Sequence, residues 1–213
     1  MAYAVKEIYY TLQGEGHMTG RPAVFLRFAG CNLWSGHERD RASAICQFCD
    51  TDFVGMDGKG GGRFATSKDL ADAVCAAWPG TVTSRAKPYV VCTGGEPLLQ
   101  LDSDLVELLQ SSGFEVAVET NGTLIPPEGL DWICVSPKAG APLLLQYGHE
   151  LKLVFPQTNA LPREFEAMEF EHFFLQPMDG PELAANTQAA LAYCLEHPQW
   201  RLSIQTHKVL DIP

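Results

Sequence analysis

The central part of the chain alternates short apolar runs with a helical segment, and this alternation constrains the fold more than any other feature. Residues 89–92 and 115–119 are predicted strands, and residues 102–112 between them have the spacing of a helix that Gly113 ends. Strand–helix–strand order is typical of parallel sheets, because parallel strands need a long crossover connection. The sequence therefore predicts an α/β fold built on a parallel sheet.

Further elements extend this pattern toward both ends of the chain. We expect other strands at residues 3–10, 23–28, 132–135, 151–155, 173–176 and 202–205, and other helices at about 66–78 and 181–197. Helices join only some of these strands, which predicts a partial, TIM-like barrel of mostly parallel strands. In such folds ligands bind beyond the carboxyl ends of the strands. One mouth should therefore be lined by the loops after Phe28, Cys92, Glu119, Val135 and Gln176.

Length, charge and composition narrow the class of protein. The 213 residues fit one α/β domain spanning 1–213, and 46% hydrophobic against 19% charged residues indicates a sizeable buried core. A net charge of −11 argues against a nucleic-acid partner. The first residues do not resemble an export signal, and no run approaches the ~18 apolar residues of a membrane helix. We expect a cytoplasmic protein that binds neither nucleic acid nor membrane.

The seven cysteines fall into two groups. Cys31, Cys46 and Cys49 lie in a long segment without lasting periodicity, and loops of that length in compact domains are usually functional or disordered. The others lie within predicted helices or strands, where a thiol usually packs as a small hydrophobe: Cys75, Cys92, Cys134 and Cys194. The first group is therefore the candidate metal site.

Two kinds of metal site fit the three loop cysteines. Three thiolates can bind three irons of a [4Fe–4S] cluster and leave the fourth iron open for a ligand. Together with His37 of the same loop, they could instead form a structural zinc site with three sulfur ligands and one nitrogen ligand. The loop by itself leaves both alternatives open.

The motif at residues 46–49, Cys-Gln-Phe-Cys, resembles the cluster loop of the radical S-adenosylmethionine (SAM) superfamily. The usual pattern has three residues between the first two cysteines, whereas fourteen separate Cys31 from Cys46 here. The fuller resemblance is to the 7-carboxy-7-deazaguanine synthase family, short radical SAM enzymes that tolerate an insertion at this point. The chain would then be a single radical SAM domain with a cluster-loop insertion at about 32–62.

Other short motifs extend the resemblance along the whole chain. Individually they have ordinary explanations, since a Gly-Gly pair can serve a tight turn and loop charges can face solvent. Their order is the specific signal: Gln13-Gly-Glu-Gly16, Arg27, Cys49-Asp-Thr51, Thr93-Gly-Gly-Glu-Pro97, Glu119-Thr-Asn-Gly122, Ser136-Pro-Lys138, Gln176-Pro-Met-Asp179 and Pro213.

The resemblance implies a role for each group of residues. Cys31, Cys46 and Cys49 would bind the [4Fe–4S] cluster, and Thr51 would bind a magnesium ion (Mg2+) together with the substrate carboxylate. SAM would be bound by Phe48, Asp50, Gly94, Gly95, Glu96, Ser136, Lys138, Gln176 and Asp179, with Glu96 facing its ammonium group. The substrate would contact Leu12, Gln13, Gly14, Glu15, Arg27, Thr93, Glu119, His207 and Pro213, of which Arg27 and Glu119 are the expected catalytic residues.

The implied reaction is a radical ring contraction. The reduced cluster would pass one electron to SAM, and a 5′-deoxyadenosyl radical would take a hydrogen atom from 6-carboxy-5,6,7,8-tetrahydropterin. Ring contraction with loss of ammonia would make the enzyme a carbon–nitrogen lyase, whose product feeds 7-deazapurine (queuosine) biosynthesis. The implied partners are the small-molecule pterin and an electron donor protein such as a flavodoxin, and a homodimer is one assembly to consider.

Two other functions remain open from the sequence. A radical SAM activase, which forms a glycyl radical on a partner protein, would use the same early cluster loop. A zinc-stabilised binding module would use Cys31, His37, Cys46 and Cys49 as structural ligands and would have no turnover.

Two residues are also notable for their position. Arg27 interrupts an apolar strand, so its guanidinium must face solvent, pair inside the fold or offer its fork to a carboxylate. Pro213 ends a segment, 208–213, that lacks the polar run of a frayed tail. We expect it to be docked, with its carboxylate accepting hydrogen bonds from the substrate.

Overall fold

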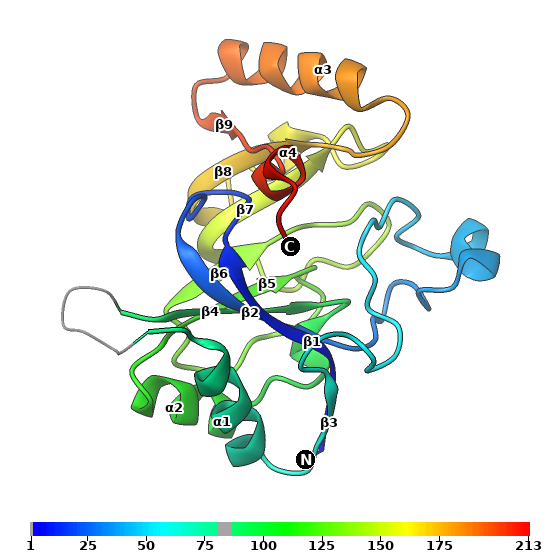
Figure 1. The fold of residues 1–213 in the computed structure, drawn as a ribbon. Helices are drawn as coiled ribbons and strands as arrows, with labels where there is room; N and C mark the ends of the chain where they lie inside the picture. The colour runs from blue at the N-terminus through cyan, green and yellow to red at the C-terminus, as the bar shows by residue number, and fades with distance from the viewer. Residues whose placement is uncertain (1, 81–86) are drawn as a thin grey trace.

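The computed structural model describes residues 2–80 and 87–213, and in these residues nine strands form one mostly parallel sheet (Figure 1). Its order is β3-β1-β2-β4-β5-β6-β7-β8-β9, with β3 and β9 at the two edges, so the barrel is open as expected. β1 pairs antiparallel with β2 and β3, and the other pairs are parallel. The bounds are β1 Tyr3–Leu12, β2 Pro22–Phe28, β3 Gly62–Phe64, β4 Tyr89–Gly94, β5 Glu115–Thr120, β6 Trp132–Val135, β7 Tyr147–Phe155, β8 Glu169–Pro177 and β9 Trp200–Leu202.

Two helices cover the N-terminal half of the sheet, α1 (Ser67–Ala77) and α2 (Ser103–Ser111) (Figure 1). The Thr66 side chain accepts a hydrogen bond from the backbone N–H of Asp69 and so caps α1. Asp102 caps α2 in the same way, through the N–H of Leu105. Their apolar faces pack on β1, β2, β4 and β5 in the larger buried cluster. Both helices confirm the prediction from the apolar spacing.

A third helix, α3 (Leu183–Glu196), lies over β8 and β9 and completes a second buried cluster around β7. The helix was expected from about residue 181, whereas it begins at Leu183 and Glu182 flanks its start. Within residues 2–80 and 87–213, three short 3-10 helices lie in connections: η1 (Glu38–Ser43), η2 (Pro97–Leu99) and η3 (Pro162–Glu164).

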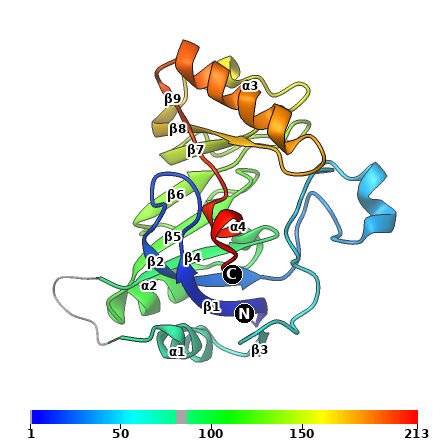
Figure 2. The same ribbon diagram turned by 45° about the horizontal axis from the view of Figure 1, so that its top comes forward.

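The C-terminal segment differs from the sequence expectation. The last strand is β9, Trp200–Leu202, because pairing with β8 ends at Leu202. After that the chain leaves the sheet, and the backbone N–H of Thr206 donates to the carbonyl of Gly14 instead. A short helix follows, α4 (Thr206–Leu210), where no independent element was expected. Figures 1 and 2 both show α4 and the C-terminus between β1 and β8, on the inner side of the barrel.

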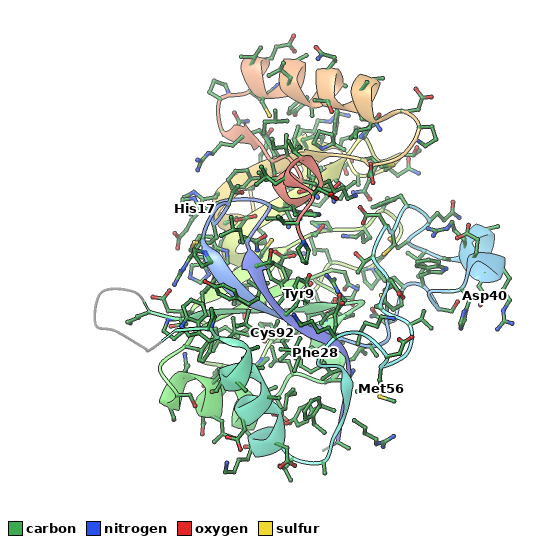
Figure 3. All side chains as sticks on the ribbon, viewed as in Figure 1. Tyr9, His17, Phe28, Asp40, Met56 and Cys92 are labelled. Atoms are coloured by element: carbon green, nitrogen blue, oxygen red, sulfur yellow. The ribbon has the colours of Figure 1, made fainter. Side chains whose placement is uncertain are left out.

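The segment expected to form a long loop, 31–62, is indeed largely irregular but contains two elements. Residues 38–43 form η1, which projects away from the sheet, as the label on Asp40 shows (Figure 3). Residues 62–64 form β3, which pairs with the start of β1 and gives the sheet an extra edge strand. Among the described helices, none has the length and apolar character required to cross a membrane.

Candidate active site

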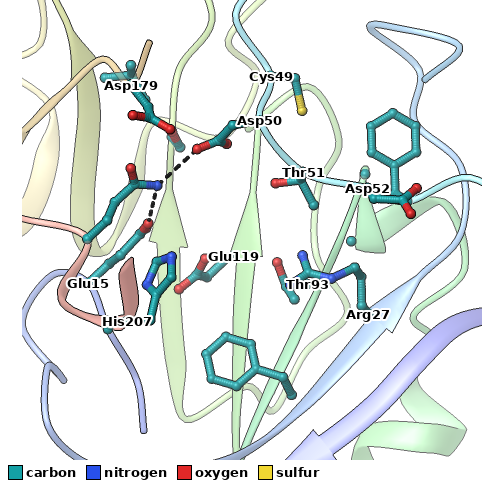
Figure 4. Close-up of a pocket in the computed structure, with 18 of the residues that line it drawn as sticks. Glu15, Arg27, Cys49, Asp50, Thr51, Asp52, Thr93, Glu119, Asp179 and His207 are labelled. Atoms are coloured by element: carbon teal, nitrogen blue, oxygen red, sulfur yellow. Dashed lines mark hydrogen bonds between the residues drawn. The ribbon is translucent and has the colours of Figure 1, made fainter. Parts of the chain in front are cut away.

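A cavity of about 640 Å³ lies beyond the carboxyl ends of the parallel strands (Figure 4). Strands β1, β2, β4, β5, β7 and β8 form its walls together with the segments 31–53 and 205–213. All but one of the residues expected at the site line it: Leu12, Gln13, Gly14, Glu15, Arg27, Cys31, Cys46, Phe48, Cys49, Asp50, Thr51, Thr93, Gly94, Gly95, Glu119, Ser136, Lys138, Gln176, Asp179, His207 and Pro213. The exception is Glu96.

The three candidate cluster cysteines share one wall of this cavity as free thiols. The neighbouring Cys46 thiol lowers the pKa of Cys49 to about 6. Burial raises the pKa of Cys31. Within the described residues, His, Cys, Asp and Glu side chains do not converge in threes as tightly as a single metal ion requires. Three free thiols around one cavity nevertheless fit an iron–sulfur cluster, because its cysteines bind separate irons rather than one centre.

Gly94 ends β4 and Gly95 follows it, and both pack against the backbone of residues 28–31 at the end of β2. A Cβ atom on Gly94 would lie 2.5 Å from the carbonyl oxygen of Phe28. A Cβ atom on Gly95 would lie 2.2 Å from the carbonyl oxygen of Gly30 and 2.7 Å from the Cβ of Cys31. Both positions therefore require glycine for backbone packing, and this packing brings the β4 turn next to the first candidate cluster ligand.

Glu96 lies behind the cavity wall, although the sequence suggested that it faces a ligand. Its side chain is fully buried. Oε1 accepts from the N–H of Leu98 at 2.9 Å and from the hydroxyl of Thr120 at 2.8 Å, and Oε2 accepts from the N–H of Asn121 at 2.8 Å. Burial raises the pKa of Glu96 despite these bonds. In this structure Glu96 joins the turn after β4 to the turn after β5.

Arg27 reaches the cavity from β2 and is held by two neighbours on β1. Its Nε donates to Oε1 of Glu7 at 2.8 Å, and its Nη2 donates to the Tyr9 hydroxyl at 2.9 Å. The guanidinium is largely buried, with 16% of the side chain exposed. A buried, oriented guanidinium on a cavity wall can bind a carboxylate through its remaining N–H groups.

Lys138 and Ser136 meet on the wall next to the cysteines. The ammonium of Lys138 donates to the Ser136 carbonyl at 2.6 Å and to its hydroxyl at 2.7 Å. Burial lowers the pKa of Lys138, and the nearby Cys46 and Cys49 act in the opposite direction. This cation therefore lies within electrostatic range of the thiols.

A polar network forms the floor of the cavity, and Figure 4 shows Glu15 and Glu119 in it. Gln13 Nε2 donates to Glu119 Oε1 at 2.9 Å. The ammonium of Lys152 lies 2.5 Å from Glu15 Oε2 and 3.5 Å from Glu119 Oε2. Gln205 Nε2 donates to the other oxygen of Glu15 at 3.1 Å.

The C-terminal segment closes one side of the cavity. Lys208 Nζ lies 2.6 Å from Asp50 Oδ2 and 2.5 Å from Asp179 Oδ2, so it joins the cysteine loop to the turn after β8. The Thr11 hydroxyl donates to the backbone oxygen of Pro213 at 2.9 Å. The segment is therefore docked as expected, through contacts with three separate parts of the chain.

The sequence of the chain was compared with those of known proteins. The chain matches no family model. It is, however, 64% identical to the 7-carboxy-7-deazaguanine synthase of Bordetella pertussis over 213 residues, and the match covers 100% of both chains. It belongs to that family. The 7-carboxy-7-deazaguanine synthase of Caulobacter vibrioides is 63% identical, also over 100% of both chains.

A solved structure of the family has the same fold. The crystal structure of QueE from Escherichia coli superposes with a TM-score of 0.72 at 28% identity, covering 97% of this chain and 95% of that one. Membership of the 7-carboxy-7-deazaguanine synthase family makes the chain an enzyme of the radical SAM type, as the motifs indicated.

The family assignment does not favour the two alternative functions. For the zinc module, the position of His37 is also unfavourable, because it is exposed on the projecting segment and is not among the residues that line the cavity. A Cys31–His37–Cys46–Cys49 site would need that segment to fold back toward the thiols.

The residues at the site that the sequence analysis missed include three with charged or amide side chains: Lys152, Gln205 and Lys208. Lys152 interrupts the apolar run of β7 as Arg27 interrupts that of β2, so the same signal was available. Gln205 and Lys208 carry no comparable signal. Their partners, Glu15, Asp50 and Asp179, are far away in the sequence, and only the tertiary structure brings them together.

Proposed function

We propose that the chain is a carbon–nitrogen lyase that converts 6-carboxy-5,6,7,8-tetrahydropterin to 7-carboxy-7-deazaguanine with loss of ammonia. The substrate has the composition of the product plus ammonia, so the conversion is redox-neutral overall. When bound, a [4Fe–4S] cluster and SAM supply the radical that abstracts hydrogen. We further propose that the whole chain, 1–213, is one radical SAM domain that receives its electron from a donor protein such as a flavodoxin.

A single observation carries this proposal: the cysteine wall, the Arg27 guanidinium and the carboxylate floor all face one cavity (Figure 4). Cys31, Cys46 and Cys49 would hold the cluster. Phe48, Asp50, Gly94, Gly95, Ser136, Lys138, Gln176 and Asp179 are the lining residues that would bind SAM beside it. For Glu96 we propose an indirect role, in which it fixes the turns around SAM.

The other side of the cavity would bind the pterin. Arg27 is oriented to bind the substrate carboxylate, with Thr93 beside it on the neighbouring strand. Glu119 and Glu15 would accept hydrogen bonds from ring N–H groups, and Glu119 is the group placed to exchange a proton with the ring. Leu12, Gln13, Gly14, His207 and Pro213 line the same part of the cavity and would complete the pterin site.

We propose that Thr51 would bind Mg2+ through its hydroxyl. The residue follows the last candidate cluster cysteine and lines the cavity beside Asp50 and Asp52. Mg2+ prefers oxygen ligands and keeps several waters, so one hydroxyl and a substrate carboxylate would suffice as direct ligands.

Two measurements test this function. Protein purified without oxygen is analysed for iron, sulfide and zinc, and we expect iron and sulfide in equal amounts with little zinc. The reconstituted protein is then incubated with the carboxypterin, SAM and a reductant, and formation of 7-carboxy-7-deazaguanine is followed.

Single replacements of Cys31, Cys46 and Cys49 by Ala should each abolish cluster binding. Cys75→Ala and Cys194→Ala provide controls, because these half-buried thiols lie on α1 and α3, outside the cavity. Loss of iron in either control variant, or product formation by a protein without iron, would contradict the assignment.

A further inference from the structure

Lys152 is a buried cation on the floor of the cavity to which the motifs assign no role. It lies on β7 between two fully buried leucines, Leu151 and Leu153, whose side chains point to the opposite face of the strand. Only 5% of its side chain is exposed, and it lines the cavity. Burying an ammonium is costly unless the charge is paired, so its partners determine what it does.

Those partners are two carboxylates that come from different parts of the chain. Glu15, from the turn after β1, lies 2.5 Å from the ammonium, and Glu119, near the end of β5, lies 3.5 Å from it. Glu15 and Glu119 are themselves 15% and 23% exposed, and both line the cavity. Lys152 therefore joins two carboxylates that the substrate would meet.

Neutral amides complete the arrangement. Gln13 donates to the remaining oxygen of Glu119 at 2.9 Å, and Gln205 donates to the remaining oxygen of Glu15 at 3.1 Å. Each carboxylate is thus fixed at both oxygens, one by the shared ammonium and one by an amide. A pair held in this way presents acceptor lone pairs to the cavity in one orientation.

The surrounding charges show that Lys152 is the cation that pairs with both carboxylates and keeps Glu15 ionised. Burial by itself raises the pKa of Glu15, but Lys152 and then Gln205 lower it below its usual value, with a smaller contribution from His207. The pKa of Lys152 is raised well above its usual value despite burial, because Glu119, Glu15, Cys134 and Glu150 surround it.

The other titratable groups near Lys152 do not replace it as the cation that pairs with Glu15 and Glu119. Glu150, on the same strand, is a buried carboxyl whose pKa is raised by burial, and Cys134 on β6 is a buried thiol whose pKa is also raised. Lys138 approaches from the turn after β6 but donates to Ser136. Without Lys152, Glu15 and Glu119 would lose the ammonium that pairs with both of them.

We propose that Lys152 is a positioning residue that holds the Glu15 and Glu119 side chains as an oriented acceptor pair, which recognises a ring edge of the substrate rich in N–H donors. This inference rests on the proposed function and extends it to the part of the site opposite Arg27. Its consequence is that loss of the cation should make substrate binding dependent on pH. A carboxyl that takes up a proton loses acceptor capacity, and removal of that proton at higher pH restores it.

The test compares Lys152→Gln with Lys152→Arg in the reconstituted enzyme. Gln keeps a hydrogen-bond donor of similar length and removes the charge, whereas Arg keeps the charge. For Lys152→Gln we expect a KM for the carboxypterin raised about tenfold or more near neutral pH. This KM should fall as the pH rises from about 6 to about 8.5, whereas that of Lys152→Arg should stay close to wild type at every pH.

Arg21→Met is the matched control, because it removes one cation of a half-buried ion pair, with Glu115, at the start of β2 and outside the cavity. Its KM should show no new dependence on pH. Iron content and thermal stability are measured for each variant, so that a loss of cluster or of fold is recognised separately.

The outcomes separate this inference from the proposed function. A wild-type enzyme that makes no product refutes the function itself. If the wild type is active and Lys152→Gln has an unchanged KM, or a raised KM that is equal at every pH, then the positioning role is wrong. The same holds if Lys152→Arg behaves like Lys152→Gln.

Discussion

Glu7 orients the guanidinium of Arg27 across the β1–β2 pair. The two residues are register partners, and Oε1 of Glu7 accepts from Nε of Arg27 at 2.8 Å. Because Glu7 uses Nε and the Tyr9 hydroxyl uses Nη2, the plane of the guanidinium is set before any ligand arrives. The charge that interrupts an apolar strand is therefore both paired inside the fold and presented to the cavity.

Arg27→Ala should weaken binding of the carboxypterin by about tenfold or more, because it removes a charge-assisted hydrogen bond of roughly 1.5–3 kcal/mol. Glu7→Gln should raise KM less, since the guanidinium remains but is held by a neutral partner. Michaelis constants of the reconstituted variants measure both effects. Arg63→Ala, on the exposed side of β3, is the control, and a wild-type KM in folded Arg27→Ala would refute the assignment.

Glu96→Ala should destabilise the protein even without any ligand. The substitution leaves the N–H groups of Leu98 and Asn121 and the hydroxyl of Thr120 without their acceptor in a buried site. We expect a loss of about 2–4 kcal/mol in the free energy of unfolding, measured by denaturant titration of the protein without cluster. A variant of unchanged stability that only fails to bind SAM would show that Glu96 acts directly on the ligand.

The same residue predicts a dependence of stability on pH. Burial raises the pKa of Glu96, so the folded state binds its proton more tightly than the unfolded state. The stability of the wild type relative to Glu96→Gln should therefore be greatest below the ordinary glutamate pKa and should decrease as the pH rises through the folded-state value. Unfolding curves of both proteins between about pH 4 and about pH 7 measure this difference, and an increase with pH would contradict it.

Arg41→Ala should weaken retention of the cluster. Arg41 Nη1 donates to the carbonyls of Gln47 and Cys49 at 3.0 Å each, and its guanidinium lies 4.0 Å from the centre of the Trp34 ring. The projecting segment thus braces the loop that carries two of the cysteines. Iron per protein after a fixed time with a chelator should fall clearly below that of wild type, with Arg41→Lys intermediate.

Arg39→Ala is the matched control for this experiment. Arg39 is on the same 3-10 helix, but 79% of its side chain is exposed. Equal iron loss in the Arg39 and Arg41 variants would mean that any change in η1 weakens cluster retention. The two hydrogen bonds of Arg41 would then have no specific role in it.

Thr51→Ala should reduce the response of turnover to added Mg2+, because the hydroxyl is the proposed ligand. Thr51→Ser keeps the hydroxyl and should respond like wild type. Turnover is measured over a titration of Mg2+ after removal of bound divalent ions. An identical titration curve for Thr51→Ala and wild type would exclude this residue as a ligand.

Much of the architecture could be predicted from local signals. Capping side chains and apolar spacing define α1 and α2, and short buried runs define β4 to β8, because these patterns depend on neighbours within a few residues. The end of the chain could not be predicted in this way. Residues 206–210 form α4 where the Thr206 hydroxyl donates to the carbonyl of Gly14, 192 residues away in sequence, and where Lys208 pairs with Asp50 and Asp179.

The sequence by itself determined the parallel α/β order, the separation of three loop cysteines from four buried ones, and the order of motifs that marks the family. Those features depend on residue type and spacing along the chain. Only the tertiary structure decided that Glu96 lies behind the cavity wall and that Lys152 joins Glu15 to Glu119. The direction in which a buried charge points depends on which distant groups can compensate it, and the strand order that brings those groups together is a property of the whole fold.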